Sequence, residues 1–395
     1  MSRDNKMKKL KTITYAFLII IGLMIGISVA AIIHNHDVYS PWWGHIIVVL
    51  ATLFLGLLIH ELTHAFVFSV QGVKIKAVYL FMFMFIRKGR IFTIKINPKL
   101  LMLGGGLVIP SLPPVTSEED LDKLQKKFAI SLIAAPITSI VFGFLWFIGF
   151  ILILFLSHNW ILISLSITST FVMLIFSLLT IIASKASSDL AMGDFPAYQE
   201  VLKNRYFLIS IIDNYLHFNE SSYHKSQPFI NEKINEYLLN EPLKYTQLSY
   251  FFISSYLFDV VFNEGKRNYN IEEKIKKLNI KILAKTMLGH TIAYLIAYLN
   301  YISGDIEQAL NQLKTIEKSS YPSILKKHAL YESKRAKHNL GLSNEIDFLT
   351  DEKNIDNGHE WILKPALEVT TNNSDYIKVL KPGIKLPKIK FFTII

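Results

Sequence analysis

The chain of 395 residues contains no cysteine. Disulfide bonds and thiolate zinc ligands are therefore excluded, and any metal site has to use histidine, aspartate or glutamate. Long hydrophobic runs are lacking after Pro196, where the composition turns to Lys, Glu, Asn, Tyr and Leu with helical periodicity. The sequence therefore predicts a membrane domain over residues 1–195 and a soluble helical domain over residues 196–395.

The first half of the chain has few charged residues over long stretches. Four segments are apolar for long enough to cross about 30 Å of hydrocarbon, and they are residues 12–33, 44–70, 128–156 and 160–184. The first segment follows a basic N-terminus as a signal peptide would, but its apolar stretch is too long for one. It is predicted to be an uncleaved helix.

Lysine and arginine are missing from the loops 34–44 and 157–159, whereas residues 3–11 and the connection 71–127 contain many of them. By the positive-inside rule, both termini and the connection are predicted to be cytoplasmic. The net charge is +11. Many of the basic residues behind it flank the spans or are expected to face anionic lipid headgroups, so nucleic-acid binding is not inferred. We expect a multi-pass protein of the cell membrane, and the bias to Ile, Lys and Asn is typical of an AT-rich bacterial genome.

The second predicted span contains His60, Glu61 and His64 in the pattern H-E-x-x-H. Two imidazoles four residues apart share one face of a helix and can bind one Zn²⁺, while the glutamate lies close enough to act on a water molecule there. Such a short pattern arises by chance in soluble helices. Within a bilayer each ionisable group costs roughly 2.5 to 3.5 kcal/mol, so the pattern favours a functional metal site.

A catalytic zinc needs a third protein ligand and an open position. Two carboxylates follow the fourth predicted span, Asp189 and Asp194, and the predicted topology puts Asp189 at the depth of the histidines. Helix-end carboxylates are common where a span meets water, but a zinc held by two histidines alone is the less probable arrangement.

Over residues 44–195 the chain resembles the site-two protease family of intramembrane zinc metalloproteases, which pair H-E-x-x-H with an Asp-Gly motif on a later helix. The resemblance implies His60 and His64 as zinc ligands, Glu61 as general base and Asp189 as third ligand. Leu190 stands where the family usually has glycine, which leaves Asp194 after Gly193 as the alternative. Residues 135–139 resemble the family's Gly-Pro-x-x-Asn segment, with two letters changed.

The connection after the H-E-x-x-H span is rich in aromatic and branched residues in 74–85 and partly alternates in 91–96, with a turn signal at 87–90. This predicts a β-hairpin. The family resemblance implies that such a hairpin lies in the membrane, where an unwinding substrate could add a strand. An ordinary structural hairpin is the alternative. The glycines of 104–106 and the prolines that follow predict an irregular or re-entrant connection.

Residues 290–322 resemble one tetratricopeptide-type helix pair, and residues 246–283 could hold a second, degenerate pair. We therefore predict an all-α membrane domain with a small embedded hairpin, followed by a helical, repeat-like domain that could bind a protein partner. A plain helical bundle is the alternative, because stacked repeats need several copies. The lysines of residues 378–390 could contact anionic headgroups, or the tail could be solvated.

Together these patterns predict a zinc endopeptidase that cleaves a transmembrane or membrane-bound peptide near its cytoplasmic end. One alternative is a non-catalytic zinc-binding membrane protein, such as an immunity or transporter accessory factor. In such a protein a fourth ligand, for example Asp194, would close the zinc site. Glu61, which is no ligand in this pattern, argues against it. A metal-ion transporter would need ionisable groups in several spans, and residues 129–156 contain none.

Overall fold

The computed structural model describes residues 41–98, 100, 105–186, 192–319, 326–344, 365–369 and 377–383. The chain divides into two compact units. The first unit comprises Met1–Val108 and Lys127–Gln199, and the second comprises Ile109–Lys126 and Glu200–Ile395. The span predicted at residues 12–33 lies outside the described residues.

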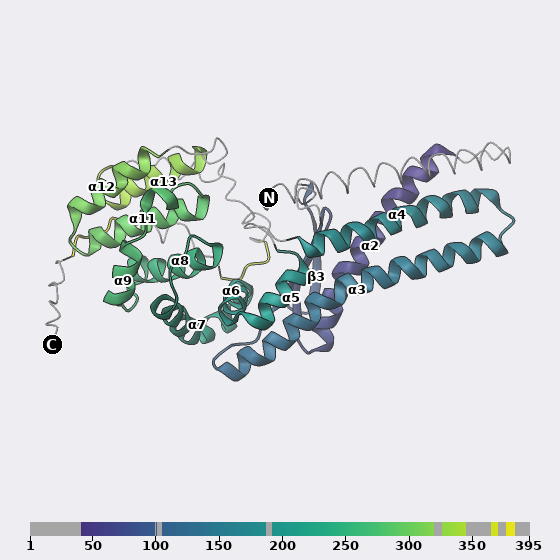
Figure 1. Cartoon of the computed structure of the whole chain (residues 1–395), viewed down its shortest axis with the longest axis horizontal. Coiled ribbons are helices and arrows are strands. Elements are labelled where there is room, and N and C mark those ends of the chain that lie inside the picture. Colours follow the sequence, from purple (N-terminus) through teal and green to yellow (C-terminus); the bar gives the residue numbers. More distant parts are fainter. Residues whose placement is uncertain are drawn as a thin grey trace, which may run out of the picture. The chain divides into compact units, whose positions relative to one another are not determined.

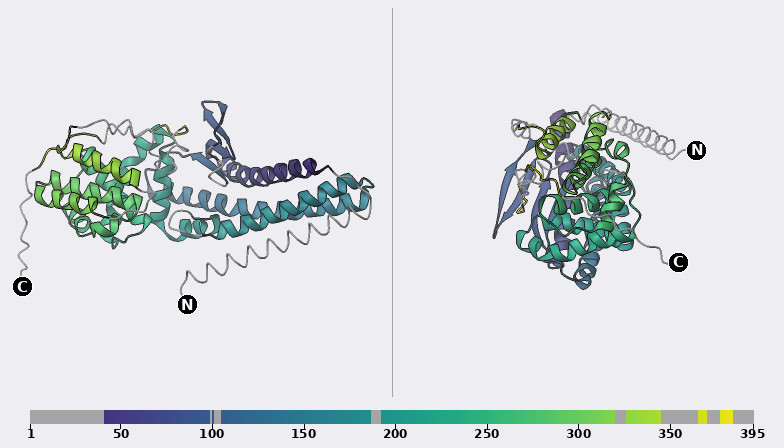
Figure 2. Two further views of the ribbon diagram at one scale, coloured as in Figure 1. Left: turned by 90° about the horizontal axis from the view of Figure 1, so that it is seen from above. Right: turned by 90° about the vertical axis from the view of Figure 1, so that its left-hand side faces the viewer.

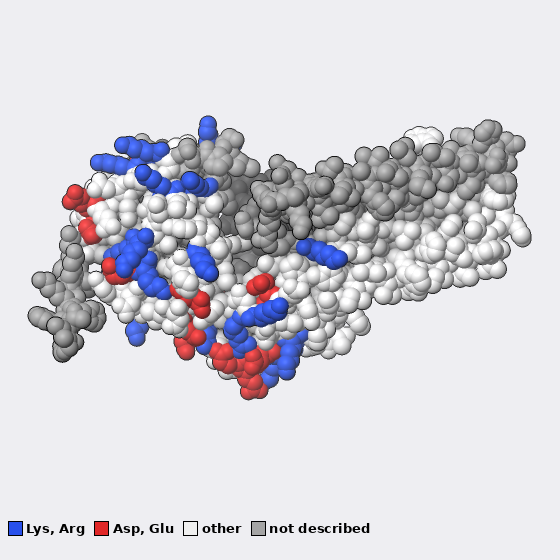
Figure 3. All heavy atoms as spheres, in the orientation of Figure 1, with Lys and Arg blue, Asp and Glu red and all other residues white. Residues whose placement is uncertain are grey.

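Three helices of the described ranges are long and apolar enough to cross a membrane, namely α2 (Trp42–Val70), α3 (Glu118–Leu156) and α4 (Trp160–Lys185) (Figure 1). They lie where the second, third and fourth spans were predicted. Large apolar side chains such as Leu50 and Phe155 are 63% and 78% exposed. Beyond the charged first turns of α3, the face of α3 and α4 seen in Figure 3 carries hardly any charged side chain. These surfaces suit lipid, as expected for a membrane protein.

Helix α3 begins about three turns before the predicted span at 128–156, because a polar segment extends it. Ser117 Oγ accepts a hydrogen bond from the Asp120 amide, and the Asp120 carboxylate accepts one from the Thr116 amide at 3.1 Å. This reciprocal capping supplies partners for the first amides of the helix. The hydropathy pattern detects the membrane segment of a helix, but not its polar continuation.

Helices α2 and α4 pack together through small and hydroxylated side chains. Thr52 and Ser169 share a buried hydrogen bond of 3.1 Å, and His45 Nδ1 lies 2.8 Å from Thr168 Oγ1. A Cβ atom on Gly56 would meet the ring of Phe176 at 2.7 Å, so glycine is needed for this close approach. Small residues and interhelical hydrogen bonds are the usual means of helix association in lipid.

The predicted hairpin is part of a four-stranded sheet with the order β3-β2-β1-β4. Its strands are β1 (Lys74–Leu80), β2 (Phe83–Lys88), β3 (Ile91–Ile96) and β4 (Gly106–Ser111), and β1 packs on α2 (Figure 2). The turn at 87–90 is confirmed, with Gly89 at φ 62°. The sequence did not reveal a second turn at Phe81, which has φ 52° and divides the predicted first strand into β1 and β2.

Strand β4 corrects the expectation that the Gly- and Pro-rich stretch after residue 104 forms no regular element. Gly106 opens this strand and Pro110 lies within it. Because β4 is at the edge of the sheet, a proline can be accommodated on the side that has no neighbouring strand.

The second unit is built from helices along most of its described length. After α5 (Asp194–Lys203), which begins in the first unit, these are α6 (Arg205–Leu216), α7 (Glu220–Asn240), α8 (Gln247–Phe262), α9 (Tyr269–Lys276), α10 (Ile280–Leu283), α11 (Met287–Ile302), α12 (Ile306–Glu317) and α13 (Lys326–Asn339).

Helices α11 and α12 form the helix pair predicted in residues 290–322, with Gly304 at φ 80° in the turn and Ala309 fully buried. The second predicted pair is instead one long helix, α8, followed by the short helices α9 and α10. Asn268 and Asn279 cap the N-termini of α9 and α10, so this stretch forms two separate short helices and not one longer helix. A tetratricopeptide-like stack therefore stays a prediction.

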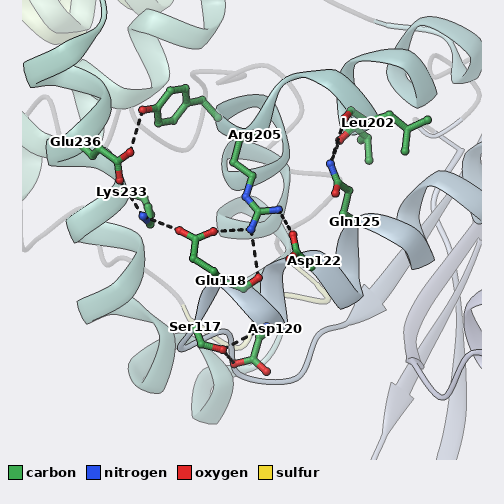
Figure 4. Close-up of polar contacts among 11 residues, drawn as sticks. Ser117, Glu118, Asp120, Asp122, Gln125, Leu202, Arg205, Lys233 and Glu236 are labelled. Carbon is green, nitrogen blue, oxygen red and sulfur yellow. Dashed lines mark hydrogen bonds and ion pairs between the residues drawn. The ribbon is translucent and has the colours of Figure 1, made fainter.

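Ion pairs join the first turns of α3 to α6 and α7 within the second unit (Figure 4). Arg205 binds both Glu118 and Asp122. Lys233, only 15% exposed, lies 2.6 Å from Glu118 and 2.8 Å from Glu236. These two carboxylates hold the pKa of the Lys233 amine above its usual value. The polar start of α3 is thus part of the helical unit that follows the membrane segments.

Part of the C-terminal tail also packs on this unit. Lys378 Nζ donates to the Phe262 carbonyl at 2.8 Å, and the Leu380 amide donates to the Asn339 carbonyl at 2.7 Å. The expectation of a lysine-rich tail on lipid headgroups does not hold for Lys378, since its ammonium group is used within the protein. The remaining lysines from residue 385 onward lie outside the described residues.

Candidate metal centre

Helix α2 presents His60 and His64 on one face, as their spacing predicts. Their ring centroids are 5.2 Å apart, and their side chains are only 12% and 13% exposed. Side chains at positions i and i+4 lie above one another along a helix, so both Nε2 atoms can face one point.

Asp194 completes the group from another part of the chain. The Gly193 amide donates to the Ala186 carbonyl at 2.8 Å, which returns the chain to the end of α4, and Asp194 then opens α5. A Cβ atom on Gly193 would overlap the Ala183 carbonyl, so only glycine permits this approach. The Asp194 carboxylate lies 3.4 Å from His60 Nε2 and 3.9 Å from His64 Nε2.

Among the described residues, His60, His64 and Asp194 form a group whose ligand atoms lie within 4.8 Å of one another. Asp189, the third ligand that the resemblance favours, lies outside the described residues. The structure therefore brings the alternative carboxylate to the histidines and leaves Asp189 as a prediction.

A serine hydroxyl contacts each member of this group. The histidines are contacted at Nδ1, away from Asp194, and Asp194 is contacted at the carboxylate oxygen that also faces His60. Ser139 Oγ lies 3.0 Å from His60 Nδ1, and Ser131 Oγ lies 3.2 Å from His64 Nδ1. Ser184 Oγ donates to Asp194 at 3.3 Å.

The two contacts of Ser139 favour one tautomer of His60. Ser139 Oγ donates its single proton to the Ala135 carbonyl at 3.0 Å, so it can only accept from His60 Nδ1–H. The Nε2 atom of a neutral His60 then presents a lone pair to the Asp194 carboxylate. Two acceptors that face each other need either a proton or a cation between them.

The spacing of these atoms fits a zinc ion. Ligands about 2.0 to 2.2 Å from a tetrahedral zinc are roughly 3.4 Å from one another. The 3.4 and 3.9 Å separations between Asp194 and the two Nε2 atoms are close to that value. Two histidines and a carboxylate are also a familiar donor set for catalytic zinc, so the residues present fit this ion.

Glu61 follows the first histidine but does not belong to the donor group. Its side chain is buried at 6% exposure, and a Cβ atom on Gly106 would overlap its Cγ and Cδ atoms. The backbone of β4 therefore packs directly on the Glu61 side chain, which leaves no room for any other residue at position 106.

Sequence reasoning found the two histidines, Glu61 and both candidate carboxylates, but not Ser131, Ser184 or Gly106. Ser139 was noticed only as part of the motif-like segment 135–139. The sequence contains one signal for two of these serines, because Ser131 and Ser139 are eight residues apart and so lie near one face of a helix. Nothing in the sequence connects Ser184 or Gly106 with the site, since both contacts depend on tertiary folding.

Comparison with known proteins gives one family. Residues 48–333 match the model of the family described as Peptidase family M50, over more than two thirds of the chain. No curated protein and no solved structure is similar enough to count as a match. The matched range includes H-E-x-x-H, the sheet, helices α3 and α4, and Asp194.

Proposed function

Since this chain belongs to peptidase family M50, the site-two protease family, and is thereby a membrane metalloprotease, we propose that it cleaves peptide bonds within the membrane. The convergence of His60, His64 and Asp194 beside apolar helices supports this proposal most strongly. The three donors would hold Zn²⁺ and leave one position open, as a catalytic site requires.

Zinc in such a site polarises the scissile carbonyl and lowers the pKa of water toward about 7. The Glu61 carboxylate would accept a proton from the attacking water and return it to the leaving amine. Its burial against β4 restricts the positions that the carboxylate can take. With Ser139 Oγ as the acceptor, the proton of His60 would lie on Nδ1 and Nε2 would remain a ligand atom.

The depth of the site sets where a substrate would be cut. His64 lies six residues before the end of α2 at Val70, which is about 9 Å along the helix axis. With the orientation predicted from the basic residues, this end of α2 faces the cytoplasm. We therefore place the cut within a transmembrane or membrane-bound segment, near its cytoplasmic end.

A helical substrate must unwind first, because its scissile amide is hydrogen-bonded within its own helix. An unwound segment could pair with a free edge of the sheet. The edges are β3 and β4, and the contact between Gly106 and Glu61 makes β4 the edge nearest to the proposed base.

We further propose that the C-terminal helical unit recruits a protein substrate or partner.

Gly106→Ala is expected to reduce cleavage about 100-fold without loss of zinc. The new methyl group would occupy the space of the Glu61 side chain, and a displacement of about 1 Å in a catalytic group can cost that much. The initial rate of cleavage in proteoliposomes measures the effect. Gly105→Ala is the matched control, since its Cβ would meet no atom within 4 Å. Similar rates of cleavage by Gly106→Ala and Gly105→Ala would contradict the contact between β4 and the Glu61 side chain.

Removal of zinc tests the proposed function itself. Purified protein in proteoliposomes is incubated with a panel of single-span substrates, which includes signal-peptide remnants, secreted peptide precursors and membrane-anchored regulators. We expect a chelator to abolish cleavage and stoichiometric Zn²⁺ to restore it, because zinc would polarise the scissile carbonyl and activate the water. Continued cleavage by protein shown to be metal-free would contradict a zinc peptidase.

A further inference from the structure

We propose that three buried serine hydroxyls, those of Ser131, Ser139 and Ser184, hold the metal-binding side chains in position, with one hydroxyl in contact with each of them. The inference rests on the proposed zinc site and assigns it three positioning residues. Ser139 belongs to the segment 135–139 that resembles a family motif, but neither the family match nor the sequence pattern assigns this role to any of the three serines.

The contacts are distributed one to one. Ser139 contacts His60, Ser131 contacts His64, and Ser184 contacts Asp194, at 3.0, 3.2 and 3.3 Å. The three serines are 3%, 1% and 4% exposed, so water does not compete freely for these hydroxyls. Most buried polar groups have a hydrogen-bond partner, and for these three hydroxyls that partner is a ligand side chain.

The geometry at Ser139 shows that the arrangement involves more than helix packing. Serine in a helix often donates to the carbonyl four residues earlier, and Ser139 does so to Ala135. Its remaining lone pair then accepts from His60. The Ser139 carbonyl in turn accepts from Ser177 Oγ of α4 at 3.2 Å, which fixes this turn of α3 against its neighbour.

The serines come from two helices that contribute no ligand. Ser131 and Ser139 lie on α3, and Ser184 lies in the last turn of α4. The ligands lie on α2 and at the start of α5. Through these hydroxyls the donor atoms are oriented by four helices. A change in the packing of α3 would therefore reach both histidines.

Groups behind metal ligands usually orient the ring and increase its basicity, and their loss costs about 10- to 100-fold in metal affinity. Carboxylates and backbone carbonyls commonly have this role. A neutral hydroxyl orients the ring without adding negative charge beside the metal. We therefore expect effects near the lower end of that range.

The test compares Ser131→Ala, Ser139→Ala and Ser184→Ala with Ser164→Ala in the full-length, detergent-solubilised protein. Ser164 is 2% exposed on α4, and its hydroxyl has no hydrogen-bond partner within the described residues, so it controls for the loss of a buried serine hydroxyl. Zinc affinity is measured by chelator competition on metal-free protein, and Co²⁺ absorption reports the geometry of the ligands. Ser139→Thr retains a hydroxyl at the most constrained position.

Each of the three alanine variants is expected to bind zinc about tenfold more weakly and to shift the Co²⁺ spectrum, while Ser164→Ala matches the wild type. Ser139→Thr is expected to recover most of the lost affinity. Unchanged zinc affinity in the alanine variants would overturn the inference, as would equal losses in Ser139→Ala and Ser139→Thr. If the wild-type protein itself binds no zinc, the proposed function fails instead, so the two failures can be told apart.

Discussion

Glu61→Gln is expected to lower the rate of substrate cleavage by about 10²- to 10⁴-fold, which is the range that a general base contributes. Glutamine has nearly the same shape as glutamate, but its amide cannot accept the proton of the attacking water. Initial rates of cleavage in proteoliposomes give the size of the loss.

Zinc content separates this effect from damage to the site. Glu61 is not among the three donors, so Glu61→Gln should retain the zinc content of the wild type. Glu119→Gln is the matched control, because Glu119 is 78% exposed and pairs with Lys123 far from the histidines in sequence. Equal cleavage by Glu61→Gln and wild type would show that the chemistry proceeds without this carboxylate.

Asp194→Ala is expected to lose zinc and cleavage together, whereas Asp189→Ala should keep both. Removal of a direct ligand should weaken zinc binding by more than the 10- to 100-fold seen when a group behind a ligand is removed. The expectation follows from the position of Asp194, 3.4 and 3.9 Å from the two histidine nitrogens. Metal analysis of both purified variants decides between the two carboxylates.

Two other results would change the assignment. Loss of zinc in Asp189→Ala alone would make Asp189 the third ligand, as the family resemblance suggests. Loss in both variants would indicate four protein ligands, which is the closed arrangement of a structural zinc site. The second result would favour a non-catalytic zinc-binding membrane protein.

The sequence predicted the three described membrane helices well because their signal is local. A long apolar stretch between polar loops has few alternatives in a bilayer, and helices at Trp42–Val70 and Trp160–Lys185 lie close to the predicted bounds. Helix α3 starts before the predicted span at 128–156 because Glu118 begins a polar extension, which hydropathy cannot detect. The turn at Phe81 was missed because no glycine, proline or asparagine marks it.

The candidate site was predictable where the motif is local and not where tertiary contacts build it. His60 and His64 are placed by helical spacing alone. The choice between Asp189 and Asp194 depends on how the chain turns after Lys185, which a motif does not encode. The roles of Gly106 and Ser184 follow from β4 meeting α2 and from α4 meeting α5, so only the folded structure reveals them.

Mapping the new chain ends of a cleaved single-span substrate tests the central claim most directly. The substrate is incubated with zinc-loaded protein in proteoliposomes, and mass spectrometry identifies both fragments. The account predicts one cut inside the membrane segment, near its cytoplasmic end, that is absent with Glu61→Gln. A cut outside the membrane segment, or the same cut with Glu61→Gln, would contradict intramembrane cleavage at the His60, His64 and Asp194 site.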